Sequence, residues 1–478
     1  LFYRAYNEFS DYNNDGQPDG TYLHTLRYSG YFDSTKCYTY SATDGRFNPS
    51  SVLASRTSLC SGAWHGNFLN WATMTRMDIL RKVLYGGTRS TDTATATVLE
   101  RASLPMDAHS FAKYYVSGTT AAPTTTDRPA LSGLTPFDQT EVTFCNTTFG
   151  DNNAVSHTNT NPPLLRAAQG NFALWNSHER RQCRWNEETI WDADGSPNGN
   201  DPARTGIAAA SNFPSRATNG LNATGVTDAD YIVRVAACVV GSLGGERCRE
   251  YPSGALKPIG LLQEYGENNQ AEFGLMTGSF SRNTSGGVLR KNASSFRGEV
   301  NYLTNGTFTR ASGIVTNLDA LKVYGYRYSD STYAAADNGP AGTSPNGFCA
   351  FQTIGLVDDQ CASWGNPIGE MFIETLRYLR GGTLTPASAY GSNSDPKGAA
   401  MGLTVATWVD PFTRGDATDN VFGPPACRPI NTVNFNASVI SYDGDTTAPF
   451  SDLGAASSLA TYINPVSYTH LTLPTILR

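Results

Sequence analysis

YIVRVAACVV, residues 231–240, decides the predicted fold, because it is apolar apart from Arg234 and has the length of a buried strand. KPIGLLQEYG, residues 257–266, predicts a helix with Pro258 in its first turn. AEFGLMTGSF, residues 271–280, predicts a second strand. A strand, a helix and a strand in this order favour a parallel pairing with the helix on one face of the sheet.

The segments on either side extend this pattern. GNFLNWATMTRMDILRKVLYGG, residues 66–87, predicts one amphipathic helix with Asn67 as its cap. NPIGEMFIETLRYLRGG, residues 366–382, predicts another, capped by Asn366. Residues 431–445 predict a further strand that ends in carboxylates. The sequence therefore predicts an α/β fold, in which helices cover a mainly parallel sheet and long loop-rich insertions interrupt it.

Composition narrows the class of protein. Of 478 residues only 16% are charged, the net charge is −7, and the pI is near 5.4. Such a chain is typical of secreted, loop-rich proteins, and it argues against a nucleic-acid-binding surface. We therefore expect no nucleic-acid partner. No apolar run approaches the roughly 18 residues of a membrane-spanning helix.

The cysteines indicate an oxidising compartment. None of the nine is spaced CxxC, which disfavours a zinc ribbon or a thioredoxin-type site. Successive cysteines suggest local disulfides. The expected pairs are Cys37–Cys60, Cys145–Cys183, Cys238–Cys248 and Cys349–Cys361. Cys427 is left over, which hints at a partner elsewhere.

The residues at both ends of the sequence favour the interpretation that the chain is a piece of a longer protein. It begins at Leu1, without an initiator methionine or a signal peptide. SYTHLTLPTILR, residues 467–478, resembles a translated sequencing adapter. We therefore exclude this last stretch from the fold prediction.

DYNNDGQPDG, residues 11–20, has the spacing of an abbreviated calcium loop. The predicted Ca²⁺ ligands are Asp11, Asn13, Asp15, Gln17 and Asp19. Gly16 stands where the backbone must turn, but Tyr22 replaces the bidentate Glu of an EF-hand. We expect weak affinity, on the order of 0.1 to 1 mM. The alternative is a surface turn that binds nothing.

Two further acidic loops are weaker candidates for a metal site. WDADGSPNGND, residues 191–201, offers Asp192, Asp194 and Asn198, but it departs from EF-hand spacing. Asp443 and Asp445 end the last predicted strand. Solvated acidic turns are the favoured reading of both loops.

TRGDATD contains Arg414, Gly415 and Asp416, the tripeptide that integrins bind when a loop presents its two charges outward. The preceding Pro411 suggests an exposed loop. An ordinary surface turn is the favoured reading, and we keep the three residues as a candidate host-binding site.

Sugar binding and catalysis have weaker support in the sequence. Tryptophans such as Trp64, Trp71, Trp175 and Trp185 could stack on glycans, although core packing is their commoner use. Glu370 and Glu374, one helical turn apart, are a carboxylate pair of the kind that hydrolases use. There is no GxSxG or HExxH motif, and the histidines at 24, 65, 109, 157 and 178 show no ligand spacing. We therefore expect a protein that is not an enzyme.

Five long blocks resemble the PilC/PilY family of type IV pilus tip adhesins and assembly factors. The blocks are WHGNFLNWATMTRMDILRKVLYGGTRSTDTAT, VLERASLPMDAHSFAKYY, PPLLRAAQGNFALWNSHERRQCRW, FGLMTGSFSRNTSGGVLRKN and SWGNPIGEMFIETLRYLRGG. The resemblance implies export through the periplasm to the cell surface, the pilus tip or the outer membrane. It also implies surface attachment, twitching motility, and contacts with minor pilins or a pilus tip complex and with a host-cell or abiotic surface receptor. The alternative is a secreted calcium-stabilised glycan-binding module or hydrolase unrelated to pili.

The resemblance also implies a domain plan, because members often pair a von Willebrand factor A-like region with a C-terminal β-propeller. We expect a family region with the calcium-type loop over 1–118, a loop-rich connection over 119–160, and a von Willebrand factor A-like adhesive domain over 161–466, before the 467–478 tail. No DxSxS motif is present, and Asn366 stands where a metal-bound Thr would be expected. No magnesium site is therefore assigned.

Overall fold

The structure is a computed structural model in which the chain forms two compact units. The first unit comprises Leu1–Asn268, Phe296–Ala311 and Lys322–Ala334, and the second unit comprises the remainder. The structure describes residues 2–5, 20–118, 127–151, 154–176, 181–188, 213–216, 221, 229–329, 331–333, 358–381, 385–386, 394–412 and 429–436.

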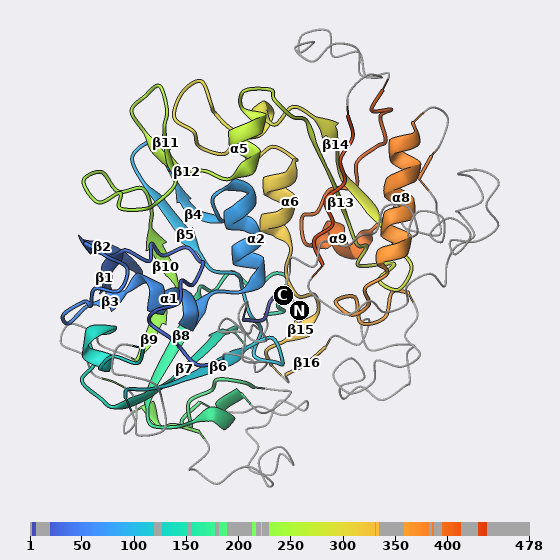
Figure 1. Ribbon diagram of the computed structural model, residues 1–478. Coiled ribbons are helices and arrows are strands. Elements are labelled where there is room, and N and C mark those ends of the chain that lie inside the picture. The colour runs from blue at the N-terminus through green and yellow to red at the C-terminus, as the bar shows by residue number, and fades with distance from the viewer. Residues whose placement is uncertain are drawn as a thin grey trace, which may run out of the picture. The chain divides into compact units, whose positions relative to one another are not determined.

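Two sheets form the frame of the first unit (Figure 1). The larger has the strand order β3-β1-β2-β10-β5-β4. Its strands are β1 (Lys36–Ser41), β2 (Arg46–Val52), β3 (Trp64–His65), β4 (Arg89–Asp92), β5 (Thr97–Glu100) and β10 (Arg234–Ala236). The smaller, in the order β6-β7-β8-β9, contains β6 (Phe111–Val116), β7 (Glu141–Thr148), β8 (Pro163–Gln169) and β9 (Asp230–Ile232).

The strand predicted over 231–240 is divided between these two sheets. β9 pairs with β8, and after one residue, Val233, β10 pairs with β5 and β2. The backbone of Val233 bonds in both directions, donating to Pro163 O at 2.9 Å and accepting from Arg101 N at 3.1 Å. One apolar stretch thus joins the sheets, and the chain leaves the ladder before Val240.

The predicted helix over 66–87 is broken into α1 (Gly66–Thr73) and α2 (Arg76–Tyr85). Thr75 stops α1 and starts α2, because its side chain and that of Asp78 form a reciprocal capping box. His65, not Asn67, caps α1, since its side chain accepts a hydrogen bond from Asn67 N. Gly86 ends α2, in the left-handed conformation at φ 86°.

All eight residues of α1 are buried, and its aromatic side chains lie at the centre of the first unit's core. Phe68 contacts Trp71, Tyr115 and Phe144 at ring-centroid distances of 5.3 to 5.4 Å, mostly edge to face. Burying apolar surface stabilises a fold by roughly 25 cal/mol per Å², and edge-to-face ring pairs add to this. The stability of the first unit therefore depends on this helix.

Because α1 has no solvent-facing side, its polar side chains must find partners inside the protein. Asn67 accepts from Tyr28 N at 2.8 Å and donates to Leu26 O at 2.8 Å. Asn70 accepts from Phe32 N at 3.1 Å and donates to Tyr28 O at 3.0 Å and Phe32 O at 2.8 Å. The described residues before β1 are irregular and pair with no strand. The side chains of these two asparagines supply the hydrogen bonds that a neighbouring strand would otherwise supply to its backbone.

The helix predicted over 257–266 begins later than expected. Residues 256–258 form β12 (Leu256–Pro258), which pairs with β11 (Cys248–Glu250), so that α5 runs only over Leu261–Gly266. Gln263 donates to Tyr85 O at 3.0 Å, which holds α5 beside α2 (Figure 1). The minor elements are η1 (Leu131–Gly133), η2 (Ala173–Asn176), η4 (Arg297–Glu299), β15 (Tyr326–Arg327) and β16 (Thr332–Tyr333).

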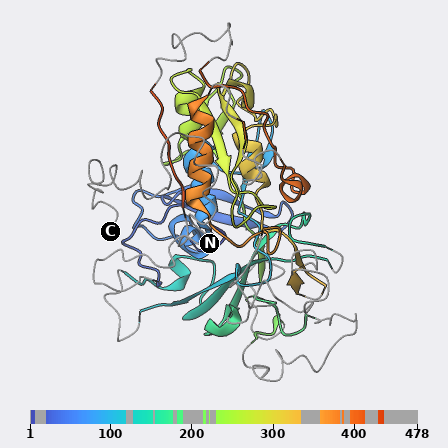
Figure 2. The ribbon, with the colours of Figure 1, turned by 90° about the vertical axis from the view of Figure 1, so that its right-hand side faces the viewer.

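The second unit contains one described hairpin, of β13 (Phe273–Thr277) and β14 (Val288–Ser294), as the sequence predicts for its first strand. Its helices are α6 (Ile314–Ala320), α8 (Ile368–Arg380) and α9 (Pro396–Ala400). Figure 2 shows α8 lying across the hairpin, which it contacts at both strands. The predicted helix over 366–382 is thus confirmed, with Pro367 rather than Asn366 at its cap. No described helix is long and apolar enough to span a membrane.

The prediction of a mixed α/β fold is confirmed, but that of a mainly parallel sheet is wrong for the described strands. Every described pairing is antiparallel except that of β10 with β2. A hairpin, β11–β12, follows β10 where the sequence suggested a crossover helix. Residues 431–436 are exposed and form no strand, and the rest of that predicted strand lies outside the described residues. The von Willebrand A-like arrangement and the boundaries near 118 and 160 stay predictions.

Three of the predicted disulfides are confirmed: Cys37–Cys60, Cys145–Cys183 and Cys238–Cys248. Cys361 is also disulfide-bonded, to a partner outside the described residues. Cys349 and Cys427 lie outside them too. The disulfides agree with an oxidising compartment.

Two histidines are buried beside α1, with ring centroids 5.0 Å apart. His65 Nδ1 accepts from Asn67 N, so its proton must lie on Nε2, which donates to Ser58 O at 3.0 Å. Burial, helped by His24 and Arg56, lowers the pKa of His65 to about 4. Burial also lowers the pKa of His24. Both rings are therefore neutral in the folded protein at neutral pH.

We predict that Asn70→Ala destabilises the first unit strongly. The substitution removes three buried hydrogen bonds to the backbone of Tyr28 and Phe32, which should cost about 3 kcal/mol of unfolding free energy. Urea unfolding of both proteins measures this. Asn301→Ala is the control, because Asn301 is an exposed asparagine of the same unit and its loss should change stability by less than about 0.5 kcal/mol. Equal effects of the two substitutions would contradict the role given to Asn70.

A second prediction concerns acid stability. Because the folded-state pKa of His65 is depressed, the unfolded chain binds its proton first, so the stabilisation is complete above about pH 6.5 and is lost as pH falls toward 4. The loss should approach about 1.4 kcal/mol per pH unit from this group. Urea unfolding at pH 7.5 and pH 5.0 measures it. His65→Asn keeps an acceptor for the cap but cannot titrate, so an unchanged pH slope in this variant would refute the assignment.

Candidate functional site

The site residues predicted from sequence lie outside the described residues. This holds for the calcium-type loop with Asp11, Asn13, Asp15, Gln17 and Asp19, and for Arg414, Gly415 and Asp416. It also holds for the acidic candidates Asp192, Asp194, Asn198, Asp443 and Asp445. The metal and integrin-type sites therefore stay predictions.

The tryptophans named as sugar-stacking candidates are core residues. Trp64, Trp71, Trp175 and Trp185 are at most 1% exposed. Two of them also use the indole N–H internally: Trp175 donates to Arg184 O at 2.6 Å and Trp185 to Asp230 Oδ1 at 3.0 Å. The suggestion that these four rings bind glycans at the surface is wrong, because no sugar can reach their faces.

The carboxylate pair Glu370 and Glu374 is fully buried in α8. Glu374 lies 3.3 Å from Arg377 on the same helix. A glycosidase pair must face a cleft that admits substrate. These two carboxylates do not, and so they give no support to catalysis.

The other described histidines have structural partners. His109 Nδ1 lies 2.8 Å from Asp107 Oδ1, and the same carboxylate accepts from His109 N. His157 stacks on Tyr324 at a centroid distance of 4.1 Å. His178 lies outside the described residues.

One cluster in the described residues has the composition of a metal site: Cys238, Glu246 and Cys248. The two sulfurs are joined in a disulfide, so neither is a thiolate that could bind a metal. Glu246 Oε2 instead accepts from Cys238 N at 2.5 Å. We interpret the cluster as structural, because the disulfide and the hydrogen bond join the two ends of the loop between β10 and β11.

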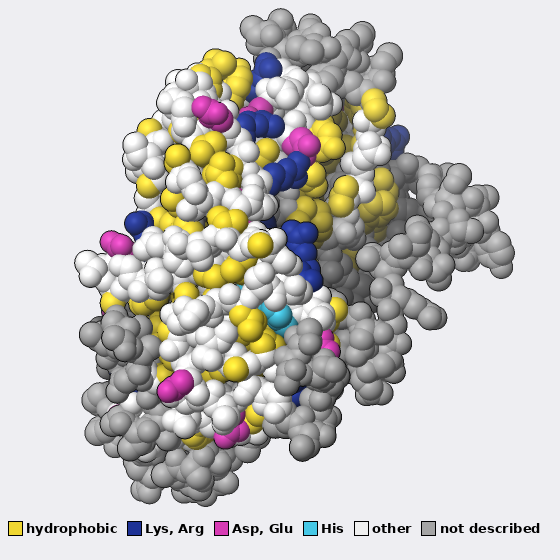
Figure 3. All heavy atoms as spheres, turned by 60° about the vertical axis from the view of Figure 1, so that its left-hand side comes forward, with side chains coloured by type: hydrophobic (Ala, Val, Ile, Leu, Met, Phe, Trp, Pro, Cys, Tyr) yellow, Lys and Arg dark blue, Asp and Glu magenta, His cyan; other side chains and the backbone are white. Residues whose placement is uncertain are grey.

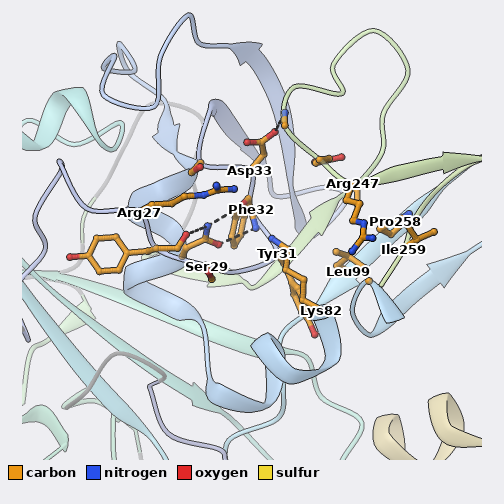
Figure 4. Close-up of a pocket in the computed structure, with 17 residues that line it drawn as sticks. Arg27, Ser29, Tyr31, Phe32, Asp33, Lys82, Leu99, Arg247, Pro258 and Ile259 are labelled. Carbon is orange, nitrogen blue, oxygen red and sulfur yellow. Dashed lines mark hydrogen bonds between the residues drawn. The ribbon is translucent and has the colours of Figure 1, made fainter. Parts of the chain in front are cut away.

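A cavity with a volume of about 180 Å³ lies in the first unit (Figure 4). The loop 27–34 forms one wall, Lys82 of α2 projects from below, and the segments around Arg247 and Ile259 form the opposite wall. Leu99 of β5 contributes to its apolar lining. We call this cavity the loop pocket.

The asparagines of α1 shape the loop pocket. Asn70 holds both ends of the Tyr28–Phe32 stretch that forms its wall. The loop approaches the helix so closely at Gly30 that a Cβ atom there would overlap the side chains of Asn70 and Met74. The wall therefore keeps one fixed position against α1.

A buried ion cluster closes one side of the loop pocket. Lys36 Nζ lies 2.9 Å from Glu246 Oε1 and 3.9 Å from Asp33 Oδ2. Asp33 Oδ2 also accepts from Gly245 N at 2.6 Å. Burial raises the pKa of Glu246, while the Lys36 ammonium opposes that rise. Both carboxylates are thus bound by groups of the protein itself.

The basic side chains of the pocket differ in their partners. Lys82 Nζ donates to Gly30 O, and burial lowers the pKa of Lys82 to about 8, although Asp33 and Glu246 act in the other direction. Arg247 pairs with Glu264. Arg27 is exposed, and no described residue forms a hydrogen bond or ion pair with it. Figure 4 shows Arg27 and Arg247 on opposite sides of the cavity with Lys82 between them.

The sequence analysis did not find this pocket. Asn67 and Asn70, three residues apart in the apolar run GNFLNWAT, are the one usable signal, because polar side chains within a buried helix must bond to something nearby. Arg27, Lys82 and Glu246 carry no spacing that sets them apart from solvated charges. Their convergence depends on tertiary structure.

Across the face shown in Figure 3, hydrophobic side chains are scattered among neutral polar ones, and acidic side chains are few. A surface of this kind agrees with the low proportion of charged residues in the sequence. It shows no broad basic face of the type that binds nucleic acid.

Comparisons with known proteins identify the family. Residues 19–168 match the family model described as "PilY1 homolog, small alpha/beta domain", and residues 273–472 match "PilY1 homolog, second domain". A protein of Xylella fastidiosa strain Temecula1 named "Type IV pilus biogenesis factor PilY1 homolog" is 33% identical over 450 residues, which cover 91% of this chain and 27% of that protein.

A second protein of the same strain and name is 29% identical over 253 residues, covering 51% of this chain and 17% of its own length. The chain therefore spans about a quarter of the first of these relatives. No solved structure matches the chain. The two domain models, in order along the sequence, show that the chain belongs to the PilC/PilY family of PilY1 homologs.

Proposed function

We propose that the protein of which this chain is a part acts in type IV pilus biogenesis at the pilus tip, where it mediates surface attachment and twitching motility. The observation that carries the proposal is the succession of two PilY1-homolog domains along one chain. The relatives that match it are named as pilus biogenesis factors. Minor pilins or a pilus tip complex are the proposed assembly partners, and a host-cell or abiotic surface receptor is the proposed adhesive partner.

Export to the cell surface, the pilus tip or the outer membrane is part of the proposal. Its support is chemical: three described disulfides close loops of the first unit, and disulfides form in the periplasm and outside the cell. A von Willebrand A-like arrangement of 161–466 is proposed from the family resemblance. Within this range the second unit contains a hairpin that α8 contacts.

We propose a role without catalysis. The carboxylate pair that raised the possibility of a hydrolase is buried in α8. In the loop pocket, Lys36 pairs with Glu246, and Asp33 accepts a hydrogen bond from Gly245 N, so neither carboxylate is left for catalysis. A calcium-stabilised glycan-binding module unrelated to pili is the alternative, but four of its candidate tryptophans are inaccessible.

Two finer parts of the proposal rest on sequence alone. Ca²⁺ bound by Asp11, Asn13, Asp15, Gln17 and Asp19 would reinforce the fold locally, because an ion that binds only the native state adds to its stability. Arg414, Gly415 and Asp416 would contact an integrin-type receptor through one cation and one carboxylate.

We predict that deleting the gene from its bacterium removes most surface pili and lowers attachment and twitching at least tenfold. Electron microscopy measures the number of pili, counts of adhering cells measure attachment, and the diameter of the twitching zone measures motility. Re-expression of the full-length protein should restore all of them. Re-expression with Asp416→Ala should restore pili and twitching but not attachment to integrin-bearing cells. Normal piliation and attachment in the deletion strain would overturn the proposed function.

We predict that the purified chain binds Ca²⁺ with a Kd on the order of 0.1 to 1 mM, and that Asp15→Ala abolishes this binding because it removes a central ligand. Calorimetric titration measures both. Asp194→Ala, in the acidic loop that departs from EF-hand spacing, is the matched control and should leave the titration unchanged. If Asp15→Ala binds as the unaltered chain does, the 11–20 stretch is a turn and not the calcium site.

A further inference from the structure

The size of the loop pocket limits what it can hold. A cavity of 150 Å³ inside a protein admits one benzene ring, so about 180 Å³ has room for one six-membered ring with a small substituent. A lone Asp or Glu side chain would leave most of the volume empty.

The lining has two chemically distinct sides. Leu99, Pro258 and Ile259 present apolar surface beside Arg247 on one side, Arg27 brings positive charge to the other side, and Lys82 lies between them. A ligand that fits must therefore combine an apolar face with an anionic group. A sugar ring has such a face in its axial C–H groups, and a carboxylate on the ring provides the charge.

The charges of the pocket favour an added anion. Asp33 and Glu246 already bond to Lys36 and to backbone amides, so groups of the protein occupy their oxygens, although the Lys36 ammonium offsets only one of the two negative charges. Arg247 is paired with Glu264. Arg27 has no anionic partner among the described residues, and Lys82 donates only to a neutral carbonyl. An incoming carboxylate would be the counter-ion of Arg27, and it would add to the negative charge that Asp33 and Glu246 already bring near Lys82.

We propose that the loop pocket binds a hexuronate, the carboxylate-bearing sugar ring of acidic polysaccharides. The Arg27 guanidinium would hold the carboxylate with two parallel N–H donors, the geometry that makes arginine the preferred partner of planar anions. Lys82 would add a point charge from α2, and the apolar wall at Leu99 and Ile259 would cover the C–H face of the ring.

This inference does not rest on the pilus role. It concerns binding by the isolated chain, and it would stand if the deletion strain kept its pili. If both hold, the pocket would give the surface protein a specificity for acidic polysaccharides. The two can fail separately, because one is measured on purified protein and the other in cells.

Titration of the purified chain with D-glucuronate, followed by calorimetry or by NMR of the protein, tests the proposal at pH 7. We expect millimolar binding of D-glucuronate and no binding of D-glucose, which lacks the carboxylate. Arg27→Ala should weaken binding at least tenfold without unfolding the protein, because Arg27 is exposed. Arg46→Ala is the matched control, an arginine of the same unit outside the pocket, and should bind as the unaltered chain does.

Lys82 gives an independent readout. It faces Arg27, Asp33 and Glu246, and its lowered pKa means that it loses its charge as pH rises through about 8. Glucuronate binding should therefore weaken severalfold between pH 7 and pH 9. Lys82→Arg should remove that decline, because a guanidinium stays charged over this range.

Three results would overturn the proposal. Equal binding of D-glucose would show that the carboxylate is not recognised. Equal competition by acetate would show a general anion site that does not recognise the ring. Unchanged affinity in Arg27→Ala would place any binding of glucuronate elsewhere on the chain.

Discussion

The first unit depends on a helix that has no exposed side. α1 lies inside the core with all eight residues buried, so the hydrogen bonds of its two asparagines must be made to other parts of the chain. Those parts are the irregular residues before β1, which have no ladder of their own. The aromatic residues of α1 hold the core together, and its asparagines fix the loop that shapes the pocket. The packing of the first unit's core and the shape of the loop pocket therefore both depend on α1.

A second buried polar cluster draws a distant part of the chain into the same unit. Arg89 of β4 donates to Gly306 O and Pro258 O, each at 2.9 Å, and its guanidinium lies 3.8 Å from the centre of the Phe308 ring. Asp92 accepts from Phe308 N at 2.8 Å. These contacts explain why residues 296–311 belong to the first unit although part of the second precedes them. Charged groups this deeply buried are held by several partners each, as their desolvation requires.

Sequence patterns predicted the elements better than their arrangement. Apolar patterning located α8 and β13, and cysteine order gave three disulfides correctly. The patterns could not show that 231–240 changes sheets at Val233, because both halves are equally apolar. They also missed the break at Thr75, where a capping box competes with continuous helical spacing. The loop pocket was beyond reach, since Arg27, Lys82 and Arg247 come from three separate segments.

The three disulfides of the first unit have a mechanical consequence. They close loops with sequence separations of 23, 38 and 10 residues. If the chain is pulled from its ends, the residues inside each covalent loop carry no tension and cannot be drawn out. An extended chain spans about 3.4 Å per residue, so the longest loop alone withholds roughly 130 Å of length from the stretching force. Under such a force the chain would extend by that much less than its number of residues allows.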